Sequence, residues 1–518
     1  MENVRILWVD DEIEFLKPHI LFLEQKNFHV TTVNNGTDAL DLISKQQFDI
    51  IFLDENMPGL SGLETLSKIK TTHPNIPIVM ITKSEEETIM EDAIGSNISD
   101  YLIKPVNPNQ ILLCVKKNLE NKRLISEKTT SVYQQEFREI SMQLQGRLNC
   151  NEWIALYKRL VYWELELEKS KDEAMSEVLV MQKAEANNVF SKFVEHNYLK
   201  WLNGVSEDNP IMSHNLLHEK VLPLFEEEES VFFILIDNLR YDQWKTIQPI
   251  FEEYYHIDSD DIYYSILPTA THYARNAIFA GLMPVQIEKK YPELWLNEED
   301  DGNKNVHESE LVGELLKRNG KTFKHSYSKV LNMNFGKKVA DNISNLLTTK
   351  FNVIIYNFVD MLSHARTDDE LIRELADNEP AYRSLTLSWF EHSSLLDIIK
   401  ALAEKKVKIV LTTDHGSIQV SNPVKMTGDK NTNTNLRYKV GKTLNYEKKD
   451  VFEVKNPAEA FLPKANVTSS YIFCKENKFF VYTNNDYAHY SNFYKNTFQH
   501  GGVSMEEMLI PVITMTPK

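Results

Sequence analysis

The sequence predicts an α/β chain in three parts: a doubly wound parallel sheet, a helical connector and a larger α/β domain. In the first 120 residues, short apolar runs alternate with amphipathic stretches, as in β–α units of a parallel sheet. From about residue 107 to 201, glycine almost vanishes and apolar residues recur at helical spacing. Alternation of strands and helices returns after residues 204–210. We expect domains at 1–122, 123–205 and 206–518.

Each part rests on particular segments. In the connector, Trp153, Leu156 and Leu160 lie on one predicted helical face. The five strands expected in the first domain are Val4–Val9, Val30–Val33, Ile50–Leu53, Ile78–Ile81 and Asp100–Ile103. The strands expected in the third part are Val231–Ile236, Val353–Asn357 and Lys408–Thr412.

Composition excludes several classes of protein. With 75 acidic and 57 basic residues the net charge is −18, which argues against duplex DNA as the main partner. The longest apolar run, Val231–Ile236, is far shorter than a membrane span, and the first residues lack the pattern of a signal peptide. Cys114, Cys150 and Cys474 form no CxxC pair, so we expect reduced thiols and a cytoplasmic protein.

Polar side chains follow the expected strands of the first domain. The carboxyl ends of parallel strands meet at one edge of a sheet, so we expect these groups to lie together. Crowded carboxylates repel one another unless a hard cation such as Mg²⁺ lies between them, and a lysine can neutralise a phosphoryl group. The residues concerned are Asp10, Asp11, Asp54, Thr82, Tyr101 and Lys104.

This set resembles the receiver domain of response regulators over its whole length. The resemblance implies a CheY-like fold, a sensor histidine kinase as partner and a homodimer promoted by phosphorylation. Asp54 would be the phosphorylated residue, and Mg²⁺ would be held by Asp11, Asp54 and the backbone carbonyl of Asn56. The family's remaining roles would fall to Asp10 in the acidic pocket, Thr82 and Tyr101 as the switch pair, and Lys104, in a cis bond to Pro105, at the phosphate.

A second group of polar residues follows the strands of the third part. Within it, His364 comes four residues after Asp360, on the same face of a helix. Aspartate and neutral imidazole are the ligands of zinc sites that keep a coordination place open. The group consists of Asp237, Thr271, Asp360, His364, Asp414, His415 and His500.

The order of these residues resembles the alkaline phosphatase superfamily, most closely its nucleotide pyrophosphatase/phosphodiesterase branch. The strings Leu267-Pro-Thr-Ala-Thr271 and Thr413-Asp-His-Gly416 support the resemblance, as does the segment from His500 to Pro511, which also looks like the end of phosphoglycerate mutase relatives. Asp237-Asn-Leu-Arg-Tyr-Asp242 and Gly428-Asp-Lys430 look like the PglZ subfamily. A receiver, a helical bundle connector and a PglZ domain together resemble PorX-type response regulators, which are associated with type IX secretion in Bacteroidetes.

The resemblance implies two zinc ions per chain. One would be bound by Asp360, His364 and His500, and the other by Asp237, Asp414 and His415 together with the oxygen of Thr271. Thr271 would attack phosphorus, because coordination by zinc favours its alkoxide, and ions about 4 Å apart would clamp the attacking and leaving oxygens. Thr269 is the rival nucleophile.

One position departs from the phosphodiesterase branch, which has an asparagine three residues after its nucleophile. Ala274 occupies that position, followed by Arg275 and Asn276. Either Arg275 or Asn276 is a candidate contact to a phosphoryl oxygen, and Arg275 is equally a candidate structural residue.

A basic segment follows the Asp414-His415 pair. Between Asn422 and Asp450 there are seven basic and three acidic residues, among many asparagines and threonines. We predict either a solvated loop without a role or a lid that steers phosphate towards the metals. In the second case Arg437, Tyr438 and Lys439 would contact the substrate, with Tyr438 stacking on a base.

The sequence therefore predicts a response regulator with a zinc phosphodiesterase output domain that acts on a nucleotide, oligonucleotide or cyclic nucleotide. A phosphomonoesterase is the alternative among enzymes, and the motif typical of sulfatases is absent. The alternative from another class is a binding module that contacts a secretion component or a transcription factor when phosphorylated. No extra Mg²⁺ site of the kind that monoesterases use is recognisable in the sequence.

Overall fold

The computed structural model describes residues 4–73, 76–83, 98–170, 172–368, 370–429, 432–464, 468–483 and 486–518. The chain divides into two compact units between Val132 and Tyr133, within one long helix, α5 (Pro108–Leu144). In the part of the chain that is described, no helix combines the length and the apolar character needed to cross a bilayer.

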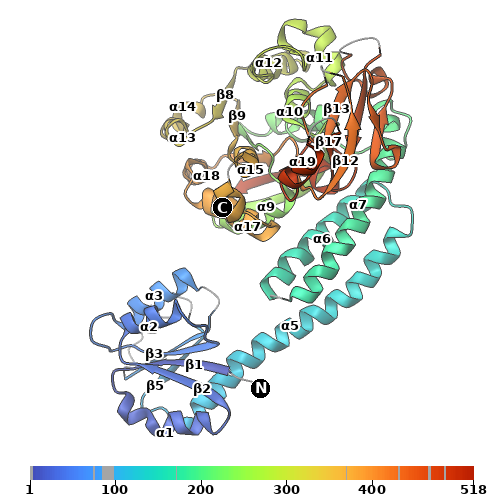
Figure 1. Ribbon diagram of the computed structural model, residues 1–518. Coiled ribbons are helices and arrows are strands. Elements are labelled where there is room, and N and C mark those ends of the chain that lie inside the picture. Colours follow the sequence, from blue (N-terminus) through green and yellow to red (C-terminus); the bar gives the residue numbers. More distant parts are fainter. Residues whose placement is uncertain are drawn as a thin grey trace. The chain divides into compact units, whose positions relative to one another are not determined.

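The N-terminal unit is built on a five-stranded parallel sheet with the order β2-β1-β3-β4-β5, which confirms the predicted fold (Figure 1). All five predicted strands form, and three of them extend one or two residues beyond the predicted ends. The strands are β1 (Val4–Val9), β2 (Phe28–Val33), β3 (Ile50–Asp54), β4 (Ile78–Thr82) and β5 (Asp100–Ile103). The helices described beside α5 are α1 (Ile13–Glu24), α2 (Gly36–Ile43) and α3 (Gly62–Thr72).

Alternate side chains of β1 point to opposite faces of this sheet and build two cores. Ile6 and Trp8 belong to a cluster with apolar residues of α1 and α5. Leu7 and Val9 belong to a second cluster with residues of α2 and α3. Helices therefore cover both faces, and the carboxyl ends of the strands remain for polar groups.

The helices of the connector pack against the C-terminal domain. Helix α6 (Cys150–Ser170) and helix α7 (Glu173–Leu202) confirm the predicted helical stretch. Trp153 is buried with its ring 5.2 Å from that of Phe190, inside the hydrophobic cluster that forms the core of the C-terminal domain. The Asn187 side chain donates to Glu506 (2.9 Å) and accepts from the backbone N–H of Met505 (2.8 Å). These helices thus share one core with that domain, and the domain limits at 122/123 and 205/206 stay a prediction.

A six-stranded sheet with the order β7-β19-β10-β6-β9-β8 forms the centre of the C-terminal domain. The four strands β10, β6, β9 and β8 are parallel, and β19 runs antiparallel to both β10 and β7. Their bounds are β6 (Val231–Ile236), β7 (Tyr255–Tyr264), β8 (His325–Val330), β9 (Phe351–Tyr356), β10 (Lys408–Thr412) and β19 (Leu509–Pro517). The strands predicted at Val231–Ile236 and Lys408–Thr412 have the observed bounds.

Helices flank this sheet (Figure 1). Those that follow its strands or neighbour the site are α9 (Tyr241–Glu252), α10 (Thr271–Ala280), α12 (Glu308–Arg318), α15 (Phe358–Asp368), α16 (Glu370–Leu375) and α17 (Glu379–Glu391). The others are α8 (Leu216–Lys220), α11 (Pro284–Lys290), α13 (Met333–Asp341), α14 (Ile343–Leu346), α18 (Ser394–Glu404), α19 (Tyr487–Tyr494) and α20 (Met505–Met508).

In the basic segment 422–450 the residues Asn422–Thr427, Tyr438–Gly441 and Asn445–Tyr446 form strands, so the prediction of one continuous loop or lid is wrong for these parts. Smaller sheets place β12 between β14 and β17, and β16 between β13 and β15, while β11 pairs with β18. Lys430 lies outside the described residues. The strands are β11 (Ile418–Gln419), β12 (Asn422–Thr427), β13 (Tyr438–Gly441), β14 (Asn445–Tyr446), β15 (Val451–Val454), β16 (Ser470–Cys474), β17 (Lys478–Tyr482) and β18 (Phe498–Gln499).

Candidate active site

The predicted phosphorylation pocket forms at the carboxyl edge of the N-terminal sheet. Oxygens of Asp10, Asp11 and Asp54 lie within 4.8 Å of one another. The Lys104 ammonium lies 2.9 Å from Asp10 Oδ2 and 2.9 Å from Asp54 Oδ1. Burial raises the pKa of Asp54, and the hydrogen bond from Lys104 opposes that rise. Three carboxylates around one ammonium leave negative charge that a hard cation can balance.

The other residues predicted for the receiver lie around this pocket. The Thr82 hydroxyl is buried and donates to the Glu55 carboxylate, a partner that the sequence did not indicate. Tyr101 is half-buried and interacts with Thr82. Asn56 is exposed in the loop after β3, and the bond between Lys104 and Pro105 is cis, as predicted.

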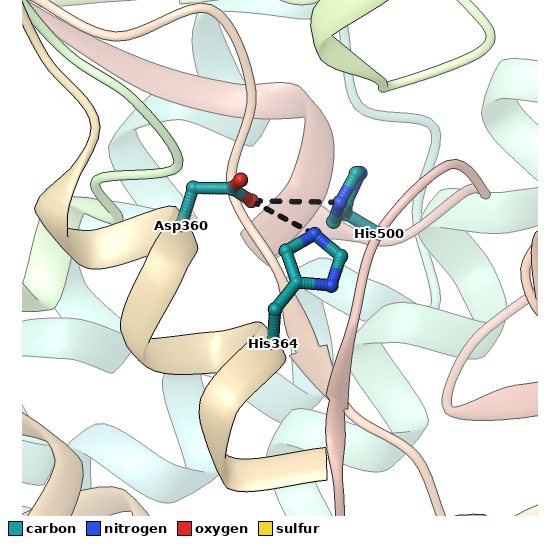
Figure 2. A group of neighbouring side chains, drawn as sticks. All are labelled: Asp360, His364 and His500. Atoms are coloured by element: carbon teal, nitrogen blue, oxygen red, sulfur yellow. Dashed lines mark ion pairs between the residues drawn. The ribbon is translucent and has the colours of Figure 1, made fainter. Parts of the chain in front are cut away.

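Two groups of predicted zinc ligands come together at the carboxyl edge of the central sheet. The first consists of Asp360 and His364 on α15 and His500 after β18, whose side chains point towards one another in Figure 2. Asp360 Oδ1 lies 3.5 Å from His364 Nε2 and 3.7 Å from His500 Nε2. His364 is largely exposed, so this group opens to solvent.

The second group is fully buried and consists of Asp237 after β6 and Asp414-His415 after β10. His415 Nε2 lies 3.8 Å from Asp237 Oδ1 and 3.9 Å from Asp414 Oδ2. The rings of His415 and His500 stack at 4.2 Å between centroids, which makes the two groups direct neighbours.

Thr271 is the first residue of α10 and is adjacent to the buried group. Its Oγ lies 3.0 Å from His415 Nε2 and 3.3 Å from Asp237 Oδ1. Thr269 is fully buried, donates to the carbonyl of Gly502 (2.9 Å) and accepts from the N–H of Gly501 (3.0 Å). Geometry therefore favours Thr271 over Thr269 as the residue that meets a phosphate.

The donor set fits two zinc ions. Burial, followed by repulsion from Asp237, raises the pKa of Asp414 well above its usual range and that of Asp360 to about 6. Asp414 Oδ2 is buried without a hydrogen-bond partner in the described residues. Burial and the neighbouring His415 lower the pKa of His500 well below its usual value, which keeps the imidazole neutral. Excess carboxylate charge beside neutral imidazoles is the environment in which zinc binds.

Arg275 contacts a predicted metal ligand rather than open space at the site, and Asn276 turns away from it, which corrects their prediction as contacts to the substrate. Arg275 is buried and donates to Asp237 Oδ2 (2.7 Å) and to Glu308 Oε1 (2.6 Å). Asn276 donates to the carbonyls of His272 (2.9 Å) and Lys304 (3.1 Å). Because α10 is buried on all sides after its first residue, positions 275 and 276 point into the protein.

Arg437, Tyr438 and Lys439 are also buried, so the proposal that they steer phosphate or stack on a base is wrong. Arg437 pairs with Glu507 (2.5 Å), and the Tyr438 hydroxyl donates to Glu298 (2.6 Å). Lys439 donates to the carbonyl of Asn433 (2.8 Å), and burial lowers its pKa to about 7. These contacts anchor the start of β13 in the domain.

Sequence reasoning missed three residues that hold the ligands. Asn238, at φ 63°, donates its amide to Asp360 (3.4 Å) and its backbone N–H to Asp414 (3.4 Å), so it bridges the two groups. Glu308 orients Arg275, and Glu507 accepts from Arg437 and from the N–H of Gly502 (2.8 Å). The position of Asn238, directly after the ligand Asp237 at a strand end, could have indicated its role. Nothing near Glu308 or Glu507 in the sequence indicates theirs.

Three family models match the chain. A response regulator receiver domain matches residues 6–116, a PorX response regulator linker domain matches 123–202, and a BREX system PglZ alkaline phosphatase-like domain matches 216–515. This order confirms the PorX-type architecture that the sequence predicted.

Curated proteins match over shorter stretches. The alginate biosynthesis transcriptional regulatory protein AlgB of Pseudomonas putida is 35% identical over 120 residues, which are 23% of this chain and 27% of that protein. The transcriptional regulatory protein SrrA of Staphylococcus aureus is 32% identical over 111 residues, 21% of this chain and 46% of that protein. The chain thus spans less than half the length of these relatives.

Solved structures of receiver domains match a similar share of the chain. A CheY-like receiver domain protein from Methanospirillum hungatei is 26% identical with a TM-score of 0.23, and the match covers 23% of this chain and 96% of that one. The BeF3-activated DrrB receiver domain is 31% identical with a TM-score of 0.22, covering 23% of this chain and 99% of that one.

Proposed function

Because this chain belongs to the family of BREX system PglZ alkaline phosphatase-like domains, we propose that its output is a zinc-dependent phosphodiesterase with Thr271 as the nucleophile. Its substrates would be phosphodiesters of nucleotides or oligonucleotides. The receiver domain that precedes it makes the protein a response regulator.

One observation carries the proposal: the Thr271 hydroxyl lies beside one complete ligand group, with a second group stacked against the first. Thr271 also begins α10, where backbone N–H groups that lack helical partners favour a bound phosphate. A nucleophile, an anion-binding helix end and two adjacent ligand groups are the parts that an in-line displacement at phosphorus requires.

The chain's own residues would act as follows. Thr271 Oγ gives up its proton and forms a bond to phosphorus while the bond to the leaving alcohol breaks, and that alcohol takes up a proton. Water then attacks phosphorus, the bond to Thr271 Oγ breaks, the threonine hydroxyl is restored and the product leaves as a phosphomonoester. Arg275, held by Glu308, fixes the Asp237 carboxylate, and Asn238 fixes Asp360 and Asp414. Two zinc ions, when bound, would supply an activated alkoxide and charge neutralisation at the phosphoryl oxygens.

The number of candidate metal sites favours a phosphodiester over a phosphomonoester as the substrate. In the described part of the C-terminal unit, two groups of three acidic or histidine residues have the geometry for a metal, and no third such group is present. A phosphomonoester dianion carries one more negative charge than a diester, and related monoesterases use an additional Mg²⁺ for it. Two metal sites without a third, as found among the described residues, fit a monoanionic diester better than a dianionic monoester.

The receiver would control this activity through Asp54. We expect a sensor histidine kinase as the source of the phosphoryl group, Mg²⁺ beside Asp11, Asp54 and Asn56, and a homodimer after phosphorylation. The PorX-type order of domains supports a role in regulating type IX secretion, with a secretion component or a transcription factor as a further protein partner.

The test is a substrate panel with zinc-loaded full-length protein: a nucleotide diester, bis(p-nitrophenyl) phosphate, a cyclic dinucleotide, a phosphomonoester and a sulfate ester. We expect turnover of diesters that Thr271→Ala abolishes while metal content stays constant. Faster turnover of the monoester would replace the proposal with a phosphomonoesterase. No turnover of any ester by fully zinc-loaded protein would leave only a binding function.

A further inference from the structure

Helix α19 presents aromatic side chains to solvent. Tyr487 and Tyr494 pack partly onto the cluster formed by Ile418, Val420, Phe479 and Val481. His489 and Tyr490 are exposed and Phe493 is half-buried. Tyr490 stacks on Tyr494 and His489 stacks on Phe493, in both cases one helical turn apart. His489, Tyr490 and Phe493 are named the α19 aromatic face.

Positive charge borders this face. The Lys425 ammonium of β12 lies 5.1 Å from the Tyr487 ring, and the Arg373 guanidinium of α16 lies 4.9 Å from the Phe493 ring. Lys495 is exposed directly after the helix. The acidic neighbour Asp486 is engaged as the helix cap and accepts from the N–H of His489. Aromatic rings beside cations, in a chain of net charge −18, form a surface suited to bases and phosphates.

Contacts connect the face to the solvent-open metal group. Gln499, next to His500, donates to the Thr367 hydroxyl of α15 (3.2 Å), and Arg373 donates to the Thr367 carbonyl. Asp360 and Thr367 lie seven residues apart on α15, about 10 Å at 1.5 Å per residue. The length along α15 alone corresponds to roughly three stacked nucleotides at 3.4 Å each, and the path continues through Arg373, whose guanidinium lies 4.9 Å from the Phe493 ring. Figure 1 shows α19 beside β17, which agrees with the contact between the two elements.

We propose that the α19 aromatic face stacks the bases of a single-stranded oligonucleotide whose scissile phosphodiester lies at the metal ligands. This inference rests on the proposed function and assigns a base-stacking surface outside the metal ligands to its oligonucleotide substrates. Stacking on an aromatic side chain depends little on the identity of the base, because every base has a π face. The exposed side chains of α19 can therefore bind oligonucleotides of any sequence.

Binding decides the inference independently of turnover. The probe is a fluorescein-labelled hexaadenylate single strand, and its anisotropy is measured with zinc-loaded full-length Thr271→Ala. Adding Tyr490→Ala should weaken binding about 5- to 150-fold, the effect of losing one base–aromatic stack. Tyr490→Phe should restore it, since the ring remains. His489→Ala is the second variant, and melting curves confirm that both exposed substitutions leave the fold intact.

Tyr162, a tyrosine of α6 that is 55% exposed, provides the matched control, and Tyr162→Ala should bind like its parent. With Thr271 intact, Tyr490→Ala should lower kcat/KM for the hexanucleotide relative to that for bis(p-nitrophenyl) phosphate. Binding of Tyr490→Ala and His489→Ala within twofold of the parent would overturn the inference and make a protein partner the occupant of this face. Loss of binding in a protein that hydrolyses no diester would uphold the base-stacking role of the face and refute the proposed function.

Discussion

Arg437→Met tests whether this residue, directly before β13, supports the fold or contacts the substrate. Arg437 is fully buried, and its Nε and Nη2 donate to Glu507 at 3.0 and 2.5 Å. Removing the guanidinium leaves a buried carboxylate without its cation, which costs about 3–5 kcal/mol. Glu507 keeps its bonds from Gly502 N–H (2.8 Å) and the Ser504 hydroxyl (2.6 Å), so we expect the lower end, about 3 kcal/mol.

The assay is urea unfolding, with the free energy obtained from the midpoint and the slope. Arg437→Met/Glu507→Gln removes both charges and should cost less than the single substitution. Lys442→Met, an exposed basic residue of the same segment, should stay within about 0.5 kcal/mol of the parent. The backbone carbonyl of Glu507 accepts from Gly416, beside His415, so Arg437→Met should reduce turnover of large and small diesters alike. A structural role would be refuted if Arg437→Met lowered the free energy of unfolding by less than about 1 kcal/mol and raised KM for a nucleotide diester alone. Arg437 would then be a substrate-binding residue.

Three further outcomes follow from the site. Thr271→Ala should bind both metals and lose hydrolysis, and normal turnover in this variant would show that Thr271 is not the nucleophile. Thr269→Ala should mainly weaken metal binding, because the Thr269 hydroxyl anchors the loop after His500. Chelation should abolish activity, and metal analysis should find about two zinc ions per chain; full activity with one zinc would refute the two-metal arrangement. Beryllofluoride should shift the protein towards a dimer in sedimentation and leave Asp54→Asn unchanged; an unaltered monomer of the parent at micromolar concentration would contradict the predicted dimer.

Much of the candidate site could be predicted because its residues follow parallel strands. Asp237 and the Asp414-His415 pair come directly after buried apolar runs, so their meeting at one edge follows from the sheet itself. The i, i+4 spacing of Asp360 and His364 likewise fixes their common face on α15. Local pattern and topology were sufficient for these positions.

Pairings between distant segments could not be predicted in the same way. Arg437 and Glu507 are 70 residues apart, and neither has a neighbour in sequence that indicates the partner. The polar composition of residues 422–450 is typical of loops, yet pairing with β17 and β16 makes strands of Asn422–Thr427 and Tyr438–Gly441, since tertiary contacts override local propensity. The sequence leaves Arg275 open as a structural residue, and its bonds to Glu308 and Asp237 show why its guanidinium turns inward.

The shared core of α6 and α7 sets a lower limit on the smallest fragment that can work as a hydrolase. A protein cut to residues 216–515, the span of the family match, would lose Trp153 and Phe190 and uncover the apolar wall on which they rest. It would also lose Asn187, which ties down the start of α20 only a few residues after the ligand His500. Such a fragment should aggregate or bind zinc poorly, whereas one that begins at Tyr133 keeps the whole compact unit. Helices α6 and α7 thus complete the hydrophobic core of the PglZ domain and are more than a linker between it and the receiver.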